Sequence, residues 1–290
     1  MGVVNVTPDS FSDGGLFFEP GTAVAHGLEL VAEGADILDI GGESTRPGAQ
    51  PVAEAQELRR VLPVVEGLAA ELASREATLS IDTSKAAVAR AALQAGAGLV
   101  NDVTALRGDP EMVEVVAASQ TQCCLMHMLG EPRTMQREPR YADVVDEVKA
   151  FLSERLAFAV AAGVAEERVL LDPGIGFGKT LAHNLELLRR LDELVALGRP
   201  LLVGTSRKSF LGRIIANTAA GTAESVGAAA SAGAPEPLAA AERLPGTLAT
   251  CVLAYERGAR VFRVHDVAPA RAALATAAAT LGAQWTTTTS

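Results

Sequence analysis

Eight short apolar runs divide this chain, and each ends on polar, ionisable or glycine residues. The runs cover residues 2–6, 36–40, 78–81, 98–100, 122–126, 168–171, 200–203 and 260–264. Amphipathic stretches of helix length separate most of them. Strands that alternate with helices pair in parallel, and eight such units in 290 residues predict an α/β fold, a single (β/α)8 TIM barrel. We expect an enzyme, because the polar and ionisable residues gather at the carboxyl ends of the strands, where the active sites of barrels lie.

The stretches between the runs predict helices at about residues 21–34, 51–74, 85–96, 109–119, 140–162, 180–197, 208–216 and 267–282. The barrel domain is therefore expected to span residues 1–282. Residues 216–246 have a low-complexity composition of Ala, Gly, Thr and Pro, which predicts an insertion ahead of the last strand. Residues 283–290 are expected to form a disordered tail.

Composition excludes several classes of protein. A net charge of −10 argues against a nucleic-acid-binding or anionic-membrane surface, so any anion site must be local. No signal peptide or membrane-spanning stretch is recognisable. Cys123, Cys124 and Cys251 lack metal-binding spacing and are most simply buried thiols in a reducing compartment. We therefore expect a cytoplasmic protein.

Lysine is rare in this chain, with four lysines against 21 arginines. Lys85, Lys179 and Lys208 all fall just after predicted strands. A lysine kept at these places indicates a need for a compact ammonium rather than a planar guanidinium. Lys208 could be a surface cation, but its rarity and position favour contact with a ligand.

Asp82, Asn101 and Asp172 each follow or end a predicted strand. A single Asp at such a place is often only a helix N-cap. Three such groups at one end of a barrel favour a ligand site, because together they can donate to and accept from the edge of a flat, amide-bearing heterocycle. The glycines around Phe177 would let its ring lie beside that ligand. Pro173 occupies the position where a nucleotide-binding P-loop needs its first glycine, which excludes that motif.

Arg263 and His265 alternate along the last predicted strand and therefore face the same side. Buried in a barrel, they need a partner. A polyphosphate would satisfy them, and a structural ion pair with Asp266 or another acid is the alternative. Asn5, inside the first run, could hydrogen-bond within the barrel or bind Mg2+ through its amide oxygen. Ser209 stands at a helix start, where free N–H groups suit a carboxylate.

Together these segments closely resemble the dihydropteroate synthase family. Residues 1–15 (MGVVNVTPDSFSDGG) and 39–48 (DIGGESTRPG) resemble its two signature loops. The match continues in order through residues 80–83, 100–103, 125–128, 171–179, 206–212 and 263–266. Members usually carry a short segment before the first strand, so we expect an internal start or an uncovered barrel bottom.

The resemblance implies condensation of 7,8-dihydropterin-6-ylmethyl diphosphate with p-aminobenzoate, sulfonamide sensitivity and a homodimer. The residues it implies for the pterin are Asp82, Asn101, Asp172 and Lys208 at the ring edge, with Met126 and Phe177 flanking its faces. Those implied for the diphosphate with Mg2+ are Asn5, Arg263 and His265. Those implied for p-aminobenzoate are Phe11, Thr45, Arg46, Pro47 and Ser209. Asp172, Lys208, Arg263 and His265 are the expected catalytic group.

Two alternatives remain at this point. A methyltetrahydrofolate-dependent corrinoid methyltransferase would share the logic of Asp82, Asn101 and Asp172, but would not explain Arg263 and His265. A catalytically silent pterin-binding paralogue would predict the loss of some loop or anion residue, and none is lost.

Overall fold

The computed structural model describes residues 1–7, 19–45, 48–73, 75–219 and 237–282. Its strands are β1 (Gly2–Asn5), β2 (Ile37–Gly41), β3 (Thr78–Asp82), β4 (Leu99–Asp102), β5 (Gln122–Met126), β6 (Val169–Asp172), β7 (Leu202–Val203) and β8 (Val261–Phe262). Its α-helices are α1 (Pro20–Ala32), α2 (Glu54–Leu72), α3 (Ala86–Gln94), α4 (Met112–Ser119), α5 (Val144–Ala161), α6 (Leu181–Arg189), α7 (Leu191–Val195), α8 (Ser209–Ala219), α9 (Leu244–Glu256) and α10 (Val267–Thr280). Two short 3-10 helices are η1 (Glu166–Arg168) and η2 (Ala240–Arg243).

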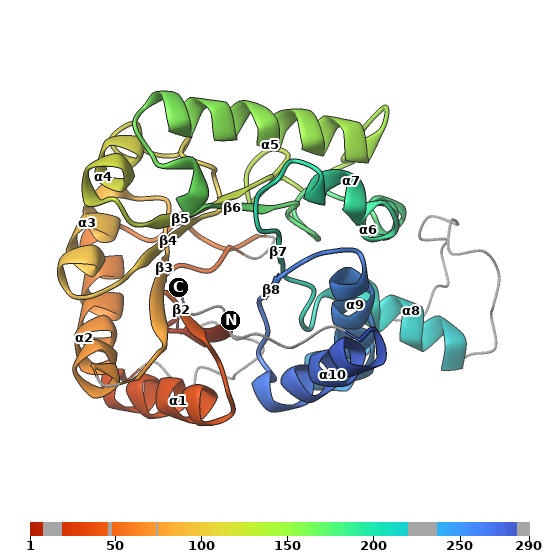
Figure 1. Ribbon diagram of the computed structural model, residues 1–290, viewed down its shortest axis with the longest axis horizontal. Coiled ribbons are helices and arrows are strands. Elements are labelled where there is room, and N and C mark those ends of the chain that lie inside the picture. Colours follow the sequence, from red (N-terminus) through yellow and green to blue (C-terminus); the bar gives the residue numbers. More distant parts are fainter. Residues whose placement is uncertain (8–18, 46–47, 74, 220–236, 283–290) are drawn as a thin grey trace.

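The strands close into a ring. β1 to β6 form one parallel sheet in chain order, and β7 pairs in parallel with β8. Isolated parallel bridges join Leu171 on β6 to Leu201, and Gly2 on β1 to Val264. Helices surround this ring on the outside (Figure 1). The predicted α/β barrel is therefore confirmed.

Side-chain alternation along the strands divides the core into two layers. Cys123 belongs to the large cluster that the strands share with the buried faces of the helices. Its neighbour Cys124 belongs instead to a small cluster with Leu99, Leu170 and Leu202, on the opposite face of the sheet. Burial raises the pKa of both thiols, which supports their interpretation as packing residues.

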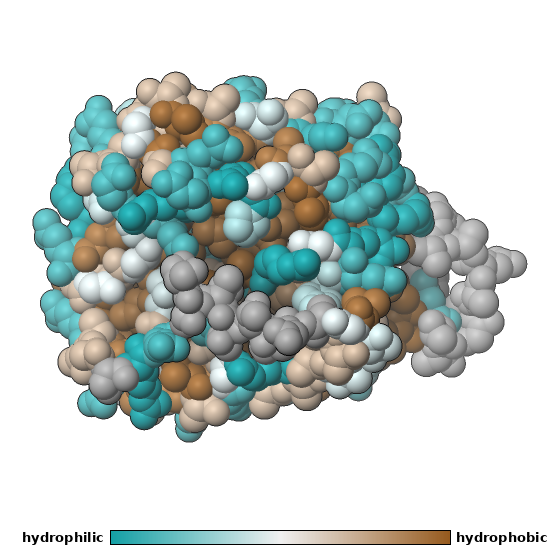
Figure 2. Space-filling view, viewed as in Figure 1, coloured by the Kyte–Doolittle hydropathy of each residue, from teal (hydrophilic) through white to brown (hydrophobic). Residues whose placement is uncertain are grey.

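Helix α2 shows why the outer helices form where they do. Its fully buried apolar residues Val61, Val64, Val65 and Leu68 recur at the spacing of one helix face. The view in Figure 2 shows hydrophilic side chains around much of the outer edge and apolar surface nearer the middle. Within the described residues, no helix is both long and apolar enough to cross a membrane.

The helix predicted at 180–197 is two helices. Arg190 breaks it with φ −107° and ψ 32°, between α6 and α7. Its guanidinium donates to Asp143 at the start of α5 and to Glu193 in α7. A tertiary ion-pair cluster around Arg190, which helix periodicity cannot reveal, accompanies the break.

Helix α9 was not predicted, although its first three residues fall in the stretch read as a low-complexity insertion. Its buried face consists of Thr247, Thr250, Cys251 and Ala254, at helical spacing. These residues are small or polar, so an apolar count misses the face they form. Helix α8 also continues to Ala219, beyond the predicted end at 216. Residues 220–236 and the predicted tail at 283–290 lie outside the described residues.

Candidate active site

The carboxyl ends of the strands bring the predicted polar residues together. In the strand register, Asn5 lies opposite Gly41, Gly41 opposite Asp82, and Asp82 opposite Asn101. Asn5, Asp82 and Asn101 therefore share one row at the end of the barrel. Asp172 ends β6 and pairs in register with Met126 on β5.

Arg263 reaches across this end of the barrel and joins two acids. Its Nε donates to Asp39 Oδ2 at 2.6 Å, and its Nη2 donates to Asp82 Oδ2 at 2.9 Å. Asn101 Nδ2 donates to the same Asp39 oxygen at 3.1 Å, and Ser80 Oγ donates to Asp39 Oδ1 at 2.6 Å. Asp39, which is fully buried, is thus the centre of the network.

The charges of this network shift two ionisation equilibria. Burial, together with the neighbouring Asp39 carboxylate, raises the pKa of Asp82, although Arg263 opposes the shift. Burial alone would lower the pKa of Arg263, but Asp39 and Asp82 raise it above its usual value. Arg263 therefore stays a cation, whereas the pKa of Asp82 is shifted toward its protonated form.

Asp39 was missed as a site residue by the sequence analysis. It lies inside an apolar run, between Leu38 and Ile40, rather than after one. An Asp is almost never fully buried without a partner, so an acid within a buried strand is itself a signal of a polar network. Its partner Arg263 lies 224 residues away, beyond the reach of any local pattern.

Asp172 and Lys208 form the opposite side of the site. Asp172 Oδ1 accepts a hydrogen bond of 2.7 Å from Gly174 N, and Lys208 Nζ donates to the carbonyl of Ile175. Burial lowers the pKa of Lys208 to about 8, with Asp172 opposing the shift. Burial raises the pKa of Asp172, with Lys208 opposing it. The carboxyl of Asp172 and the ammonium of Lys208 are thus close enough to influence each other's ionisation.

The glycine-rich turn after β6 requires glycine most strictly at Gly174. Gly174 has φ +65°, and a Cβ there would lie 1.8 Å from the carbonyl oxygen of His127. Lys179 holds the turn through hydrogen bonds. Its Nζ donates to the carbonyls of Gly174 and Phe177, each at 3.0 Å, and lies 2.9 Å from His127 Nδ1. Lys179 is 3% exposed, so it shapes the turn rather than contacting solvent.

His127 packs behind the glycine-rich turn. Its ring packs edge-on against Phe151, with centroids 4.9 Å apart. Burial and the Lys179 ammonium lower the pKa of His127 to about 3. The imidazole is therefore neutral at physiological pH and can accept the hydrogen bond from Lys179.

Met126 and Phe177 lie in one apolar cluster. Val103, Met126, Met128 and Met135 are buried together, and the half-buried ring of Phe177 packs against them. Lys208 Nζ lies 4.6 Å from the centre of that ring. Both side chains therefore belong to one apolar cluster beside Lys208.

Arg263 and His265 have different partners. His265 Nδ1 lies 2.9 Å from Ser206 Oγ, which connects β8 to the turn after β7. Asp266, considered as a structural partner of the Arg-His pair, instead pairs with Arg207, with N–O distances of 3.0 and 2.6 Å. Arg263 uses two of its five N–H groups on Asp39 and Asp82.

Three predicted site residues, Phe11, Arg46 and Pro47, lie outside the described residues. Thr45 is half-buried on the loop after β2, and Ser209 is exposed as the first residue of α8. The structure therefore places these two at the same end of the barrel as Asp82 and Asp172.

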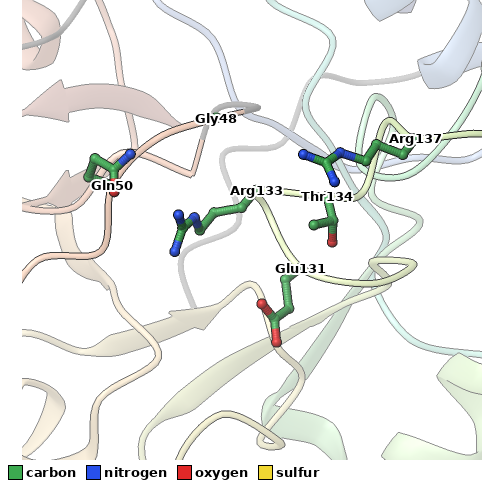
Figure 3. Close-up of a pocket in the computed structure, with 6 residues that line it drawn as sticks. All are labelled: Gly48, Gln50, Glu131, Arg133, Thr134 and Arg137. Atoms are coloured by element: carbon green, nitrogen blue, oxygen red, sulfur yellow. The ribbon is translucent and has the colours of Figure 1, made fainter.

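A cavity of about 320 Å³ opens beside the loop after β2. Figure 3 shows it between the loop after β2, which contributes Gly48 and Gln50, and the segment after β5. That segment contributes Glu131, Thr134 and two arginines, Arg133 and Arg137. The cavity gives the strand-end face a basic rim on the side of the β2 loop.

A protein-only metal cage is absent from the described ranges, where no three His, Cys, Asp or Glu side chains are grouped to bind a metal ion. Asn5 ends β1 in the row with Asp82 and Asn101. Mg2+ commonly keeps most of its waters and takes its other ligands from substrate phosphates, so a single amide oxygen from Asn5 is compatible with such a site.

Comparison with known proteins agrees with this geometry. The family model described as "Pterin binding enzyme" matches residues 1–265. The chain is 44% identical over 284 residues to the dihydropteroate synthase of Escherichia coli K12, covering 98% of this chain and 92% of that protein. A structure of Yersinia pestis dihydropteroate synthase in complex with a sulfonamide drug matches with a TM-score of 0.85 and 42% identity, over 98% and 94% of the two chains. A Xanthomonas albilineans dihydropteroate synthase with 4-aminobenzoic acid matches with a TM-score of 0.82 and 46% identity, over 98% and 93%.

Proposed function

Since this chain belongs to the dihydropteroate synthase family, we propose that the polar network at the strand ends binds the pterin substrate of that reaction. The chain is a transferase that joins 7,8-dihydropterin-6-ylmethyl diphosphate to p-aminobenzoate and releases pyrophosphate, a step of folate biosynthesis. The observation that carries the assignment is the pairing of Arg263 with Asp39 and Asp82. Asn101 also donates to Asp39.

The pterin edge would be held by Asp82, Asn101, Asp172 and Lys208. A pterin ring offers N–H donors and carbonyl or ring-nitrogen acceptors along its edge. Asp172 can accept from the donors, and the Lys208 ammonium can donate to the acceptors. Asp82, with its raised pKa, is suited to share or donate a proton at this edge. Such buried hydrogen bonds discriminate strongly against rings that cannot make them.

Met126 and Phe177, which belong to one apolar cluster, would flank the faces of the ring. Methionine sulfur and aromatic rings pack well against flat π systems. Lys208 over the Phe177 ring would place its ammonium between this cluster and the pterin edge.

The diphosphate would be bound by Asn5, Arg263 and His265. Arg263 has further N–H groups besides those on its two acids, and it remains charged. When bound through Asn5, Mg2+ would neutralise charge on the leaving diphosphate. Because Asp39 and Asp82 share one arginine, a proton on Asp82 would lessen their repulsion of the anion.

The p-aminobenzoate would be bound by Phe11, Thr45, Arg46, Pro47 and Ser209. Ser209 opens helix α8, where free backbone N–H groups suit the carboxylate of this substrate. The Xanthomonas relative holds 4-aminobenzoic acid, and the Yersinia relative holds a sulfonamide drug. We therefore expect sulfonamides to compete with p-aminobenzoate in this protein.

The chemistry would depend mainly on charge stabilisation. Arg263 and His265 would stabilise the departing diphosphate, and the pterin can delocalise a cation at its exocyclic methylene. Departure can then precede attack by the neutral arylamine, which loses its proton afterwards. This order requires no strong general base. Loops at 7–20 and 41–50 would exclude water that could otherwise trap the cation.

The protein would act as a cytoplasmic homodimer with Mg2+ as its cofactor. The reducing environment inferred from its three free, buried cysteines supports this location.

Pyrophosphate release from the pterin diphosphate tests these assignments directly. With Mg2+ present, we expect release that depends on p-aminobenzoate and is blocked by a sulfonamide. An Asp172→Ala variant with full activity would overturn the pterin assignment. Undiminished diphosphate binding in an Arg263→Ala/His265→Ala variant would overturn the anion assignment. Tight pterin binding without release would instead indicate a silent paralogue.

A further inference from the structure

A cluster of charges lies outside the substrate contacts proposed above, at the base of the loop after β2. Lys85, which precedes α3, donates through Nζ to Glu43 and to Glu57. Glu57 lies on α2 and is fully buried, whereas the side chains of Lys85 and Glu43 are 22% and 24% exposed. One ammonium therefore joins a helix to the loop that carries Thr45.

The second oxygen of Glu43 closes the base of that loop. Glu43 Oε1 accepts a hydrogen bond of 3.2 Å from Val52 N, nine residues further along the chain. Arg60 Nη1 donates to the carbonyl of Gly42 at 2.7 Å. We call Gly42, Glu43 and Val52 the loop neck, because these contacts tie the start of the loop to its end and to α2.

Helix α2 packs directly onto the loop neck. A Cβ on Gly42 would lie 2.7 Å from Val61 Cγ1 and 3.0 Å from Glu57 Cγ. The first distance is shorter than real Cβ contacts and the second is unusually tight, so the close approach favours a glycine. The neck is thus held by packing on one side and by Lys85 on the other.

The charge arrangement is poorly explained by stability alone. Two carboxylates share one ammonium, and Glu57 Oε1 has no hydrogen-bond partner within the described part of the chain. Ion pairs removed from water often give no net stability, because desolvation offsets their attraction. The contacts of Lys85 and Glu43 do fix the geometry of the loop neck.

We propose that Lys85 is a positioning residue for p-aminobenzoate, which fixes the loop neck through Glu43 so that Thr45 can meet this substrate. The inference rests on the proposed assignment of Thr45 to the p-aminobenzoate site. Lys85 lies three residues after Asp82, so the end of β3 serves the pterin edge and the loop neck together.

Steady-state kinetics with both substrates tests the proposal in three variants. Lys85→Met keeps the side-chain stem but removes the ammonium, and Glu43→Gln removes the loop's charge. Lys85→Met/Glu57→Leu also removes the buried carboxylate that the first change leaves unpaired. Arg90→Met on α3 is the matched control, because it removes an exposed ion pair with Glu111 away from the loop.

We expect the KM for p-aminobenzoate to rise about tenfold or more in all three variants, with the KM for the pterin diphosphate within about twofold of wild type. The double variant should recover the melting temperature lost by Lys85→Met without recovering that KM. Lys85→Arg should restore much of the affinity, since its guanidinium can still join two carboxylates.

An unchanged p-aminobenzoate KM in Glu43→Gln and in the double variant would overturn the proposal, provided that Thr45→Ala raises the same KM. An equal rise in both KM values would also overturn it, because the effect would then be a general disturbance of the barrel. If Thr45→Ala itself leaves the p-aminobenzoate KM unchanged, the assignment of the loop fails and this proposal fails with it.

Discussion

The guanidinium of Arg263 lies 2.6 Å from the carboxylate of Asp39. The contact joins β2 to the segment that follows β8, and these two segments are the neighbours of β1 in the ring. The same guanidinium reaches Asp82 on β3. The structural alternative, an ion pair of Arg263 with an acid, is therefore present, with Asp39 and Asp82 rather than Asp266 as the partners. Its position before substrate arrives depends on Asp39, which makes Asp39 a residue of the site.

Replacing Asp39 with Asn should weaken both folding and catalysis. The change keeps the shape but removes the charge that Arg263 needs, and a buried hydrogen bond to a charged group contributes about 1.5–3 kcal/mol. We expect a loss of this size in the free energy of unfolding, measured by denaturant titration. We also expect a fall of about tenfold or more in kcat/KM for the pterin diphosphate.

The control for that experiment is Asp36→Asn, three residues earlier. Asp36 is exposed, and its carboxylate lies 3.8 Å from Arg271. Exposed ion pairs contribute about 0–1 kcal/mol, so this variant should resemble the wild type. Equal behaviour of the two variants would contradict a special role for Asp39.

Sequence patterns pointed to Asp82, Asn101 and Asp172 because these residues follow or end apolar runs, whereas Asn5 lies inside the first run. Asn5, Asp82, Asn101 and Asp172 stand where strands of a parallel barrel must end, so the fold alone brings them to one face. Alternation along the last run likewise placed Arg263 on the inner face. These predictions needed only local periodicity and one rule of barrel architecture.

The features that the sequence did not reveal depend on contacts between distant residues. Asp39 acquires its role from Arg263, and the break at Arg190 is accompanied by ion pairs with Asp143 and Glu193. Helix α9 buries Thr247 and Thr250 rather than large apolar residues, so its periodicity is hidden in a small-residue background. Each case requires knowledge of the partner, which a single sequence does not supply.

The pH dependence of catalysis should report Lys208. Burial lowers its pKa to about 8, so the ammonium proposed to donate to the pterin is lost as the pH rises through that value. We expect kcat/KM for the pterin diphosphate to fall above about pH 8 in the wild type. In Lys208→Arg, activity will be lower, but this alkaline fall should move to higher pH because arginine stays charged.

The same group has the opposite effect on stability. The pKa of Lys208 is lower in the folded than in the unfolded chain, so the unfolded chain binds more protons between the two values. Its contribution to the free energy of unfolding therefore rises with pH between about 8 and 10.5. A fall in activity over this range that merely followed unfolding would contradict the assignment, and circular dichroism at each pH distinguishes the two.

Replacing Lys179 with Met should destabilise the turn after β6. The change leaves His127 Nδ1 and the carbonyl of Phe177 without the Lys179 donor, whereas the carbonyl of Gly174 keeps a 3.0 Å hydrogen bond from Phe177 N. Each unsatisfied buried acceptor costs about 1–3 kcal/mol. We expect a lower melting temperature and a higher KM for the pterin diphosphate, because Phe177 and the carbonyl bound by Lys208 belong to this turn. Lys149→Met on α5 is the control, and a comparable effect there would argue against the proposed role of Lys179.

Gly174→Ala should be more damaging than an alanine at another left-handed glycine. Gly174 combines φ +65° with a carbonyl oxygen 1.8 Å from the position of a Cβ, whereas Gly198 has φ +79° and nothing within 4 Å. Gly198→Ala should therefore show only backbone strain, about 1–2 kcal/mol. In Gly174→Ala the turn must also move away from His127, which displaces the backbone N–H that Asp172 accepts from. We expect a further loss of unfolding free energy and a fall in pterin affinity, measured by denaturant titration and calorimetry. Equal losses in the two variants would show that the turn can move freely, and would contradict its role in fixing Asp172.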